Sequence, residues 1–252
     1  MNSTVYGHSS YSDTIVEHHD MPPHAAEIKE RGNTDSDGNN ELERATIQQF
    51  TRLGAKHLKL LNFKKAQIAF EHAFRKSINQ KDNATLNQKC ALNLAAVYIA
   101  QGRAEKAVHY LQLASPLAEV TGCAGDYHYN AAIAHENMGN LQSASAEFCC
   151  ALKEYKAENA SPDIIANVAM KTGLVHMKLH KNSQAAASFD TAIEIYSSQS
   201  LVSQLAIALC MKGSCLAHTG DKSAAIETCR ESVGLSKGLT QDKFLGEARF
   251  FG

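Results

Sequence analysis

The chain has 252 residues, of which 20% are charged and 44% hydrophobic, and its formal net charge is -1. This near-neutral balance gives no signal for binding nucleic acid, so no nucleic-acid partner is expected. No apolar run approaches the roughly 18 residues that a membrane-spanning helix needs, so no membrane partner is expected either.

The first part of the chain, residues 1–45, is rich in Ser, His, Asn, Asp and Gly. It carries nine acidic and three basic side chains. Such a segment buries too little apolar surface to offset the entropy lost on ordering. We therefore predict a disordered acidic N-terminal tail over 1–45, with a short helix over 24–31 left open. A regulated or self-docking segment is the functional alternative to an unstructured leader.

The cysteines and the N-terminus bear on the compartment. Seven cysteines form an odd set with no C-x-x-C pair, and most of them fall at apolar helical positions, where a thiol behaves as a small hydrophobe. The N-terminus lacks the basic start and the apolar stretch of a secretory signal. Together these features favour a reducing, cytoplasmic location.

From residue 46 onward the sequence indicates pairs of helices. The stretch from Ile47 to Ser77 reads as two short amphipathic helices with a break near Leu61. Gly54 lies inside the first helix, where it costs about 1 kcal/mol relative to alanine. The simplest reason for this glycine is a second helix that passes too close for a side chain. Four stretches downstream repeat the same arrangement.

The five copies share an order of residue types. A small residue in the first helix occurs at Gly54, Ala95, Ala132, Gly173 and Gly213. An alanine in the second helix follows at 66, 107, 144, 185 and 225, and a larger residue at Phe70, Leu111, Phe148, Phe189 and Cys229. The small residues predict a close approach of the two helices of each pair, and the larger residues are expected to fill space toward the neighbouring unit.

This order resembles the tetratricopeptide repeat, a helix–turn–helix unit. The resemblance implies an all-α fold, a right-handed superhelix or α-solenoid of five helix pairs plus a terminal helix. The copies are 41, 37, 41 and 40 residues apart, which is longer than the usual spacing of about 34 in the family. The extra residues are expected to lengthen helices near 78–87, 117–124, 156–165 and 197–205. The first-helix Trp and the repeat-ending Pro of the family pattern are missing.

The resulting division of the chain has three parts. After the tail over 1–45 come five tetratricopeptide-like repeats within 46–236, at about 47–81, 88–121, 125–158, 166–199 and 206–236. Residues 237–252 are expected to form a capping helix or a partial sixth repeat. The apolar ending at Phe250 and Phe251 is unusual for a cap, so a truncated form is one interpretation.

No pattern in the sequence points to catalysis. There is no G-x-S-x-G, no P-loop and no GxGxxG after a strand. His57, His135 and His176 occupy the slot that Tyr98 holds in the second repeat, which predicts packing residues with a polar end. His176 and His180 have a metal-capable i, i+4 spacing, but no third ligand accompanies them. We therefore expect no enzyme activity, no metal site and no cofactor.

The resemblance also implies a binding surface, because the first helices of such repeats line a concave groove. The candidate peptide-binding residues are Thr51, Lys89, Leu92, Asn93, Ile99, Tyr129, Asn130, Ile133, Met170, Leu174 and Met177. Asn93 and Asn130 stand where family members hydrogen-bond the backbone of an extended peptide. Exposed apolar residues usually mark an interface. The alternative is that these side chains pack within a tightly wound superhelix, or face a docked tail.

One class of peptide is not expected. Chaperone-binding members of the family clamp a C-terminal carboxylate with Lys and Asn side chains on the first two repeats and Lys and Arg on the third. Thr51 and Ala55 replace the first pair here, and Asp126 and Asn130 replace the third. Only Asn93 matches, so a chaperone C-terminal tail is not expected as a partner.

The sequence therefore predicts a non-catalytic protein–protein interaction scaffold or adaptor that binds an extended or helical partner peptide in its concave groove. The alternative is a regulatory or structural subunit of a larger assembly, which binds through its convex face or its ends. The apolar residues Phe250 and Phe251 are the support for that alternative.

Overall fold

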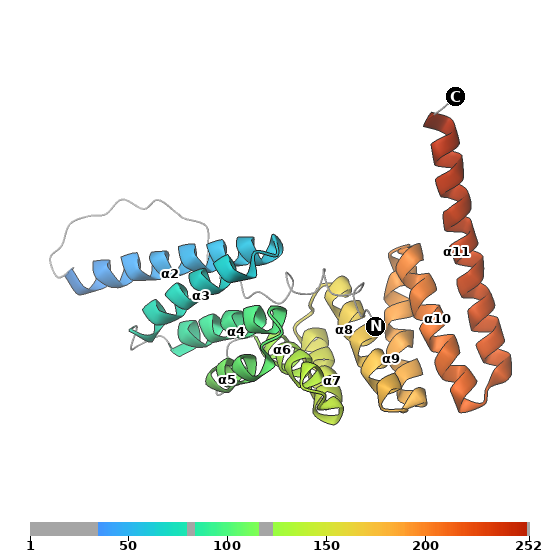
Figure 1. The fold of residues 1–252 in the computed structure, drawn as a ribbon, viewed down its shortest axis with the longest axis horizontal. Helices are drawn as coiled ribbons and strands as arrows, with labels where there is room; N and C mark the ends of the chain where they lie inside the picture. Colours follow the sequence, from blue (N-terminus) through green and yellow to red (C-terminus); the bar gives the residue numbers. More distant parts are fainter. Residues whose placement is uncertain (1–34, 80–83, 116–122, 251–252) are drawn as a thin grey trace. The chain divides into compact units, whose positions relative to one another are not determined.

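The protein is helical wherever its structure is described. The computed structural model describes residues 35–79, 84–115 and 123–250, with side chains for 41–79, 84–115 and 123–238. These residues form ten helices and no strand (Figure 1). The expected all-α class of consecutive helix pairs is thus confirmed. The chain divides into two compact units, Met1–Met138 and Gly139–Gly252.

Each unit is built from five of the described helices. Unit 1 contains α2 (Asp35–Lys59), α3 (Phe63–Ile78), α4 (Ala84–Ala100), α5 (Ala104–Ala114) and α6 (Ala124–Asn137). Unit 2 contains α7 (Leu141–Ala157), α8 (Pro162–Lys178), α9 (Asn182–Ser198), α10 (Val202–Thr219) and α11 (Lys222–Phe250). In unit 1, α2 packs against α3 and α4 against α5, and in unit 2, α8 packs against α9 and α10 against α11.

The outermost boundaries differ from those expected. Helix α2 begins at Asp35, so residues 35–45 of the expected tail are helical, because extending an existing helix costs far less than starting one. The remainder of that tail, with the helix considered over 24–31, lies outside the described residues. Helix α11 continues to Phe250. Residues 237–250, which were expected to form a separate capping helix or a partial sixth repeat, are therefore the last part of α11.

The turns within the pairs share one backbone conformation. The residue seven positions after each small residue has a positive φ: Leu61, Gly102, Gly139, His180 and Gly220, between 55° and 91°. In four of these turns the next amide donates to the carbonyl five residues back, at 2.8–3.1 Å, as from Asn62 to His57. This left-handed closure satisfies carbonyls at the end of the first helix and reverses the chain.

The small residues lie against the second helix of their own pair. A Cβ atom built on Gly54 would lie 2.6 Å from the ring of Phe70, and one on Gly173 would lie 2.6 Å from the ring of Phe189. Only glycine leaves room for these rings at such a separation. Phe70 and Phe189 therefore cover the first helix of their own pair, where the sequence had placed them toward the neighbouring unit.

The last pair follows the same register with a smaller side chain. A Cβ atom on Gly213 would lie 2.5 Å from Sγ of Cys229. Ala95 and Ala132, which hold the small position in the second and third pairs, are fully buried. The contacts confirm for the three glycines that the small residue faces a neighbouring helix, and Ala95 and Ala132 do not face solvent.

Candidate protein-interaction surface

The eleven candidate residues divide by burial. Thr51, Leu92, Asn93, Ile99, Tyr129, Asn130 and Ile133 are each 7% exposed or less. All of them belong to unit 1. Lys89, Met170, Leu174 and Met177 are partly exposed. The seven buried residues therefore offer no exposed apolar surface to a peptide. Of the partly exposed residues, Met170, Leu174 and Met177 all lie on α8 of unit 2.

Helix α4 explains why the inner face of unit 1 is closed. It packs against α2, α3, α5 and α6, and every residue from Cys90 to Ile99 is buried. Side chains surrounded by four helices have no face left for a peptide. Thr51 on α2 is also engaged, because its Oγ1 donates to the Ile47 carbonyl at 2.9 Å. These seven side chains are thus packed among the helices of unit 1.

The two asparagines of the expected peptide contact are interior residues. Asn93 is fully buried and Asn130 is 2% exposed. The side-chain nitrogen of Asn130 has no hydrogen-bond partner within the described residues. A buried donor in this state costs about 1–3 kcal/mol. The amide that was expected to bind a peptide is therefore present but covered in this arrangement.

Unit 2 is more open on the equivalent helices. Met170, Leu174 and Met177 follow one another at i, i+4 and i+7, so they form one stripe along α8, which we call the α8 stripe. Their inner atoms pack on a buried cluster that contains Ala185, Phe189 and Cys215, and their outer parts remain accessible.

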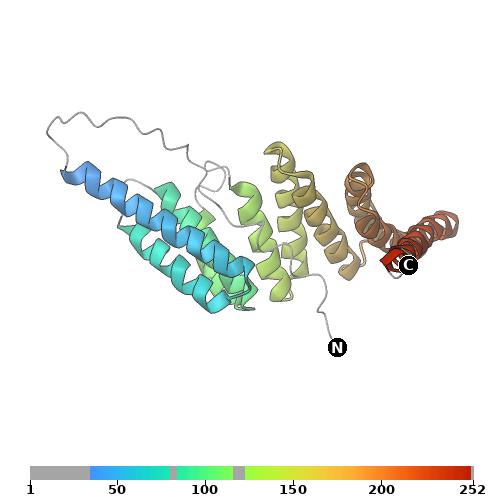
Figure 2. The ribbon, with the colours of Figure 1, turned by 90° about the horizontal axis from the view of Figure 1, so that it is seen from above.

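Helix α10 extends this surface. Met211 packs on the same buried cluster as the α8 stripe and is partly exposed, as are Ile207 and Ser214, while Cys210 is exposed. Helix α9 packs against both α8 and α10 (Figure 2), so it supports the two first helices from one side.

The histidine slot has different surroundings in different repeats. His176 is 6% exposed and its Nδ1 lies 3.4 Å from Oγ of Ser188. Burial lowers the pKa of His176, and the nearby charge of Lys181 lowers it further. The slot is therefore a packing position here, as expected. Within the described residues no group of three or more His, Cys, Asp and Glu side chains could hold a metal ion.

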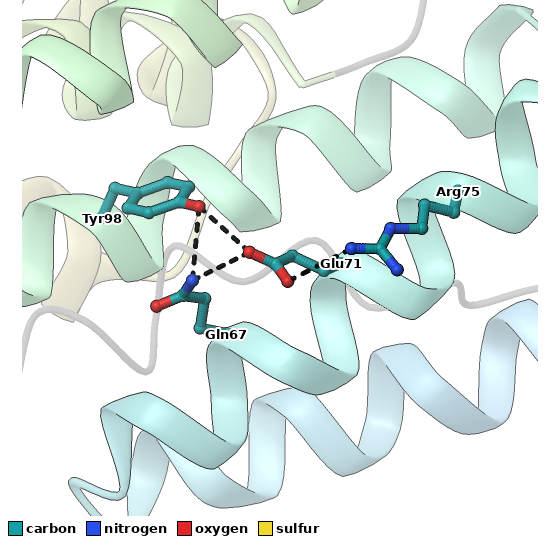
Figure 3. Close-up of polar contacts among 4 residues, drawn as sticks. All are labelled: Gln67, Glu71, Arg75 and Tyr98. Atoms are coloured by element: carbon teal, nitrogen blue, oxygen red, sulfur yellow. Dashed lines mark hydrogen bonds and ion pairs between the residues drawn. The ribbon is translucent and has the colours of Figure 1, made fainter.

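A polar cluster on unit 1 was not anticipated beyond its tyrosine. The Tyr98 hydroxyl donates to Oε1 of Glu71 at 3.1 Å, and Nε2 of Gln67 donates to the same oxygen at 2.8 Å (Figure 3). Arg75 lies 3.8 Å from the other carboxylate oxygen. The Tyr98 ring stacks on Tyr110 at 5.4 Å.

The electrostatics of this cluster follow from its packing. Burial raises the pKa of Tyr98 to about 12, and Tyr110 and Glu71 add to the shift. The cluster joins α3 to α4 and α5, so it is a structural contact between successive pairs. Only the repeat position of Tyr98 could have indicated it, because Gln67 and Glu71 look like ordinary surface residues of a helix.

Comparisons with known proteins agree with this architecture. Residues 206–238 match the family model of the tetratricopeptide repeat. BtubC (BKLC) from P. vanneervenii has a similar structure, with a TM-score of 0.62 and 17% identity over 82% of this chain and 93% of that chain. The MamA protein gives a TM-score of 0.58 and 16% identity over 79% of this chain and 96% of that chain.

A third solved structure is also similar. It is the putative kinesin light chain of Podosopora anserina with nearly identical TPR-like repeats, at a TM-score of 0.59 and 12% identity over 79% of this chain and 96% of that chain. At such identities the likeness concerns the fold. The matched model and these neighbours support the tetratricopeptide repeat family.

The matched segment and the remaining pairs are linked by register. The segment 206–238 contains the contact of Gly213 with Cys229. The contacts of Gly54 with Phe70 and of Gly173 with Phe189 repeat it at the same sequence interval.

Among the described residues no helix is both long and apolar enough to cross a membrane.

Proposed function

We propose that this chain is a non-catalytic protein-interaction scaffold and that unit 2 binds a segment of a partner protein over the α8 stripe and the adjoining residues of α10. The observation that carries this proposal is the partial exposure of Met170, Leu174 and Met177 on α8. The residues at the corresponding positions of α4 in unit 1, Leu92, Ala96 and Ile99, are buried. Apolar side chains held at a surface by a rigid core are typical of interfaces.

The chemistry of the stripe favours an apolar segment, extended or helical. Methionine is unbranched and polarisable, so Met170 and Met177 can adapt to different partner side chains. Leu174 between them supplies a fixed apolar contact. Ser214 and His218 on α10 add polar groups, although His218 Nδ1 already lies 2.8 Å from the Ser214 carbonyl. The proposal does not use the seven buried positions of unit 1.

Direct crosslinking tests this surface. A photo-crosslinking amino acid at Leu174 is expected to capture a partner segment that the same amino acid at Glu194, exposed on α9, does not capture. The captured segment is then synthesised and its affinity measured. Leu174→Asp is expected to weaken binding about tenfold or more, which corresponds to about 1.4 kcal/mol, whereas Glu194→Lys is expected to have no effect.

Two results would contradict the proposal: equal capture at Leu174 and Glu194, or an unchanged affinity of Leu174→Asp. A substitution at a buried candidate residue, such as Leu92→Arg, does not test the proposal. Leu92 is 2% exposed, so an arginine there would destabilise unit 1 whichever surface the partner binds.

Two further aspects of the proposal rest on the sequence. We place the protein in the cytoplasm because none of its seven cysteines forms a disulfide. The opening motif IQxxTRxG at 47–54 and the segment 125–135 are similar to tetratricopeptide repeat protein 24, a resemblance that brings no known activity with it. A reciprocal sequence comparison over all five repeats tests this closer relationship.

A further inference from the structure

Helix α11 has a face that corresponds to the contact between successive helix pairs. The register comes from the packed large residue of each second helix: Phe70 in α3, Phe189 in α9 and Cys229 in α11. Counting from that residue, the positions at -3, +1 and +4 are Ile226, Arg230 and Val233 in α11. We call these three residues the α11 face.

In α3 this face receives the next helix pair. Gln67, at the position of Ile226, lies 3.4 Å from the Tyr98 hydroxyl of α4. Glu71, at the position of Arg230, accepts the hydrogen bond from that hydroxyl. Phe74, at the position of Val233, packs edge-on against Tyr110 of α5 with ring centroids 5.5 Å apart.

In α9 the same face receives α10. Ala186, at the position of Ile226, is 8% exposed. Asp190, at the position of Arg230, pairs with Lys212 of α10, with Oδ1 and Nζ 2.6 Å apart. Ile193, at the position of Val233, packs against the cluster that includes Ala208 of α10. Both examples thus place a polar pair at the centre of this face, and α9 also places apolar residues, Ala186 and Ile193, at its two ends.

On α11 the face is uncovered by the described residues. Ile226 is 59% and Val233 51% exposed. Arg230 is exposed and makes no ion pair within the part of the chain that the structure describes. The face therefore combines two large aliphatic side chains with a charge that nothing described neutralises.

Gly234 on α11 has no packing role within the described residues. Gly54, Gly173 and Gly213 each admit a side chain that a Cβ atom would displace, whereas a Cβ atom on Gly234 would meet nothing within 4 Å. Glycine disfavours a helix interior, and the described fold gives Gly234 no compensating contact. It lies beside Val233 and Arg230, about 40° from Arg230 around the helix axis. The corresponding residues of the two internal examples, Arg75 of α3 and Glu194 of α9, are exposed, so the contact between successive pairs leaves this position open.

We propose that the α11 face binds an amphipathic helix of a partner protein that carries a carboxylate between two small or aliphatic residues. The polar position of the contact is matched in both internal examples, Tyr98 with Glu71 and Lys212 with Asp190. The guanidinium of Arg230 matches a carboxylate, which it can bind with two parallel hydrogen bonds. This site is separate from the α8 stripe and goes beyond the scaffold function proposed above.

The test uses the full chain and a synthetic probe. The probe is a fluorescein-labelled stapled helix with leucine and alanine on one face and one glutamate at the centre of that face, and its binding is followed by anisotropy. Saturable binding is expected. Arg230→Glu is expected to weaken it about tenfold or more, since reversing the charge replaces attraction by repulsion. A probe with lysine in place of glutamate is expected to bind the Arg230→Glu variant and not the original chain.

Matched variants separate this site from others. Glu231→Lys, an exposed charge change on another side of α11, and Leu174→Asp on the α8 stripe are both expected to leave probe binding unchanged. Absence of binding, equal binding of the glutamate and lysine probes, or equal effects of Arg230→Glu and Glu231→Lys would each overturn the proposal. Loss of binding in Leu174→Asp would also overturn it.

A stability measurement completes the test. Ile226→Asp and Val233→Asp are expected to melt at the temperature of the original chain, because both side chains are exposed, while abolishing probe binding. A fall in melting temperature as large as that of Phe189→Ala would show that the chain itself covers this face, and would overturn the proposal.

Discussion

At the residue scale, one missing β-carbon sets the distance between paired helices. Phe189 is fully buried and its ring occupies the space that a side chain on Gly173 would need. The same holds for Phe70 and Gly54. Because the obstruction is an aromatic ring inside a packed core, it cannot move aside without disturbing its neighbours. Gly213 faces the smaller side chain of Cys229, which is exposed and has room to turn.

This difference predicts graded effects of one substitution. Gly173→Ala is expected to lower the free energy of unfolding by about 1–3 kcal/mol through overpacking, and Gly213→Ala by less. Gly234→Ala, in open space within a helix, is expected to raise it by about 0.5–1 kcal/mol. Urea denaturation followed by circular dichroism measures all three. Partial recovery of Gly173→Ala by Phe189→Leu is the control, and a neutral Gly173→Ala would contradict the packing described.

At the element scale, the left-handed turns carry an unequal strain. Gly102, Gly139 and Gly220 adopt positive φ without a steric penalty, whereas Leu61 and His180 have a Cβ atom in the same conformation. The turn is nevertheless closed in the same way, because Lys181 donates to the His176 carbonyl at 2.9 Å. The hairpin geometry therefore holds the strained residue in place.

Exchanging the residue types at these turns should change stability in opposite directions. His180→Gly is expected to raise the free energy of unfolding by about 0.5 kcal/mol, and Gly220→Ala to lower it by about 1 kcal/mol. Both changes lie in unit 2, so the same denaturation experiment reports on both. If His180→Gly instead lowers the free energy of unfolding, the imidazole of His180 stabilises the fold by more than the positive φ of this residue destabilises it.

The helix pairs could be predicted from sequence because their pattern is local. The small residue, the turn and the large residue recur at fixed intervals, and a pair of helices needs nothing else to be recognised. Exposure of the inner face could not be predicted in this way. Leu92 and Met170 occupy the same position of their repeats, yet Leu92 is 2% exposed and Met170 is accessible. The difference arises from the packing of α4 against α2 and α6, which no local pattern encodes.

Element ends and polar contacts were missed for related reasons. Helix α2 begins at Asp35, and α11 continues past the expected boundary at residue 236 to Phe250, because cooperative extension overrides weak local preferences. The contact of Tyr98 with Glu71 joins residues 27 positions apart in two helix pairs. Without the packing of α3 on α4, Glu71 is one exposed acid among many.

At the scale of the whole molecule, the seven thiols divide into two classes. Cys149, Cys150, Cys210 and Cys229 are exposed, and Cys90, Cys123 and Cys215 are buried. Burial raises the pKa of Cys90 to about 11 and also raises that of Cys215. Burial slows the reaction of a thiol in two ways: it keeps the reagent away from the sulfur, and it raises the pKa and so lowers the fraction of the reactive thiolate.

Titration with a chromogenic disulfide reagent is therefore expected to show four fast thiols in the native protein and the other three only after unfolding. Within the fast class Cys149 is expected to be the slowest. Its thiol is accessible but partly desolvated by its surroundings, which raises its pKa, and the neighbouring Cys150 raises that pKa further. Cys210→Ser is the control and is expected to remove one fast thiol. Reaction of all seven at one rate would show that the described core opens readily.

The constant interval from small residue to left-handed turn has a consequence for how such a chain can change. In every pair seven residues separate the two positions, as from Gly173 to His180, whereas the distance between pairs varies from 37 to 41 residues. Deleting one residue inside a hairpin would rotate its first helix by about 100° and move Gly173 away from Phe189. Hairpins can thus diverge by substitution but not by length, and the connections between them are the natural crossover points at which whole hairpins can be exchanged as cassettes.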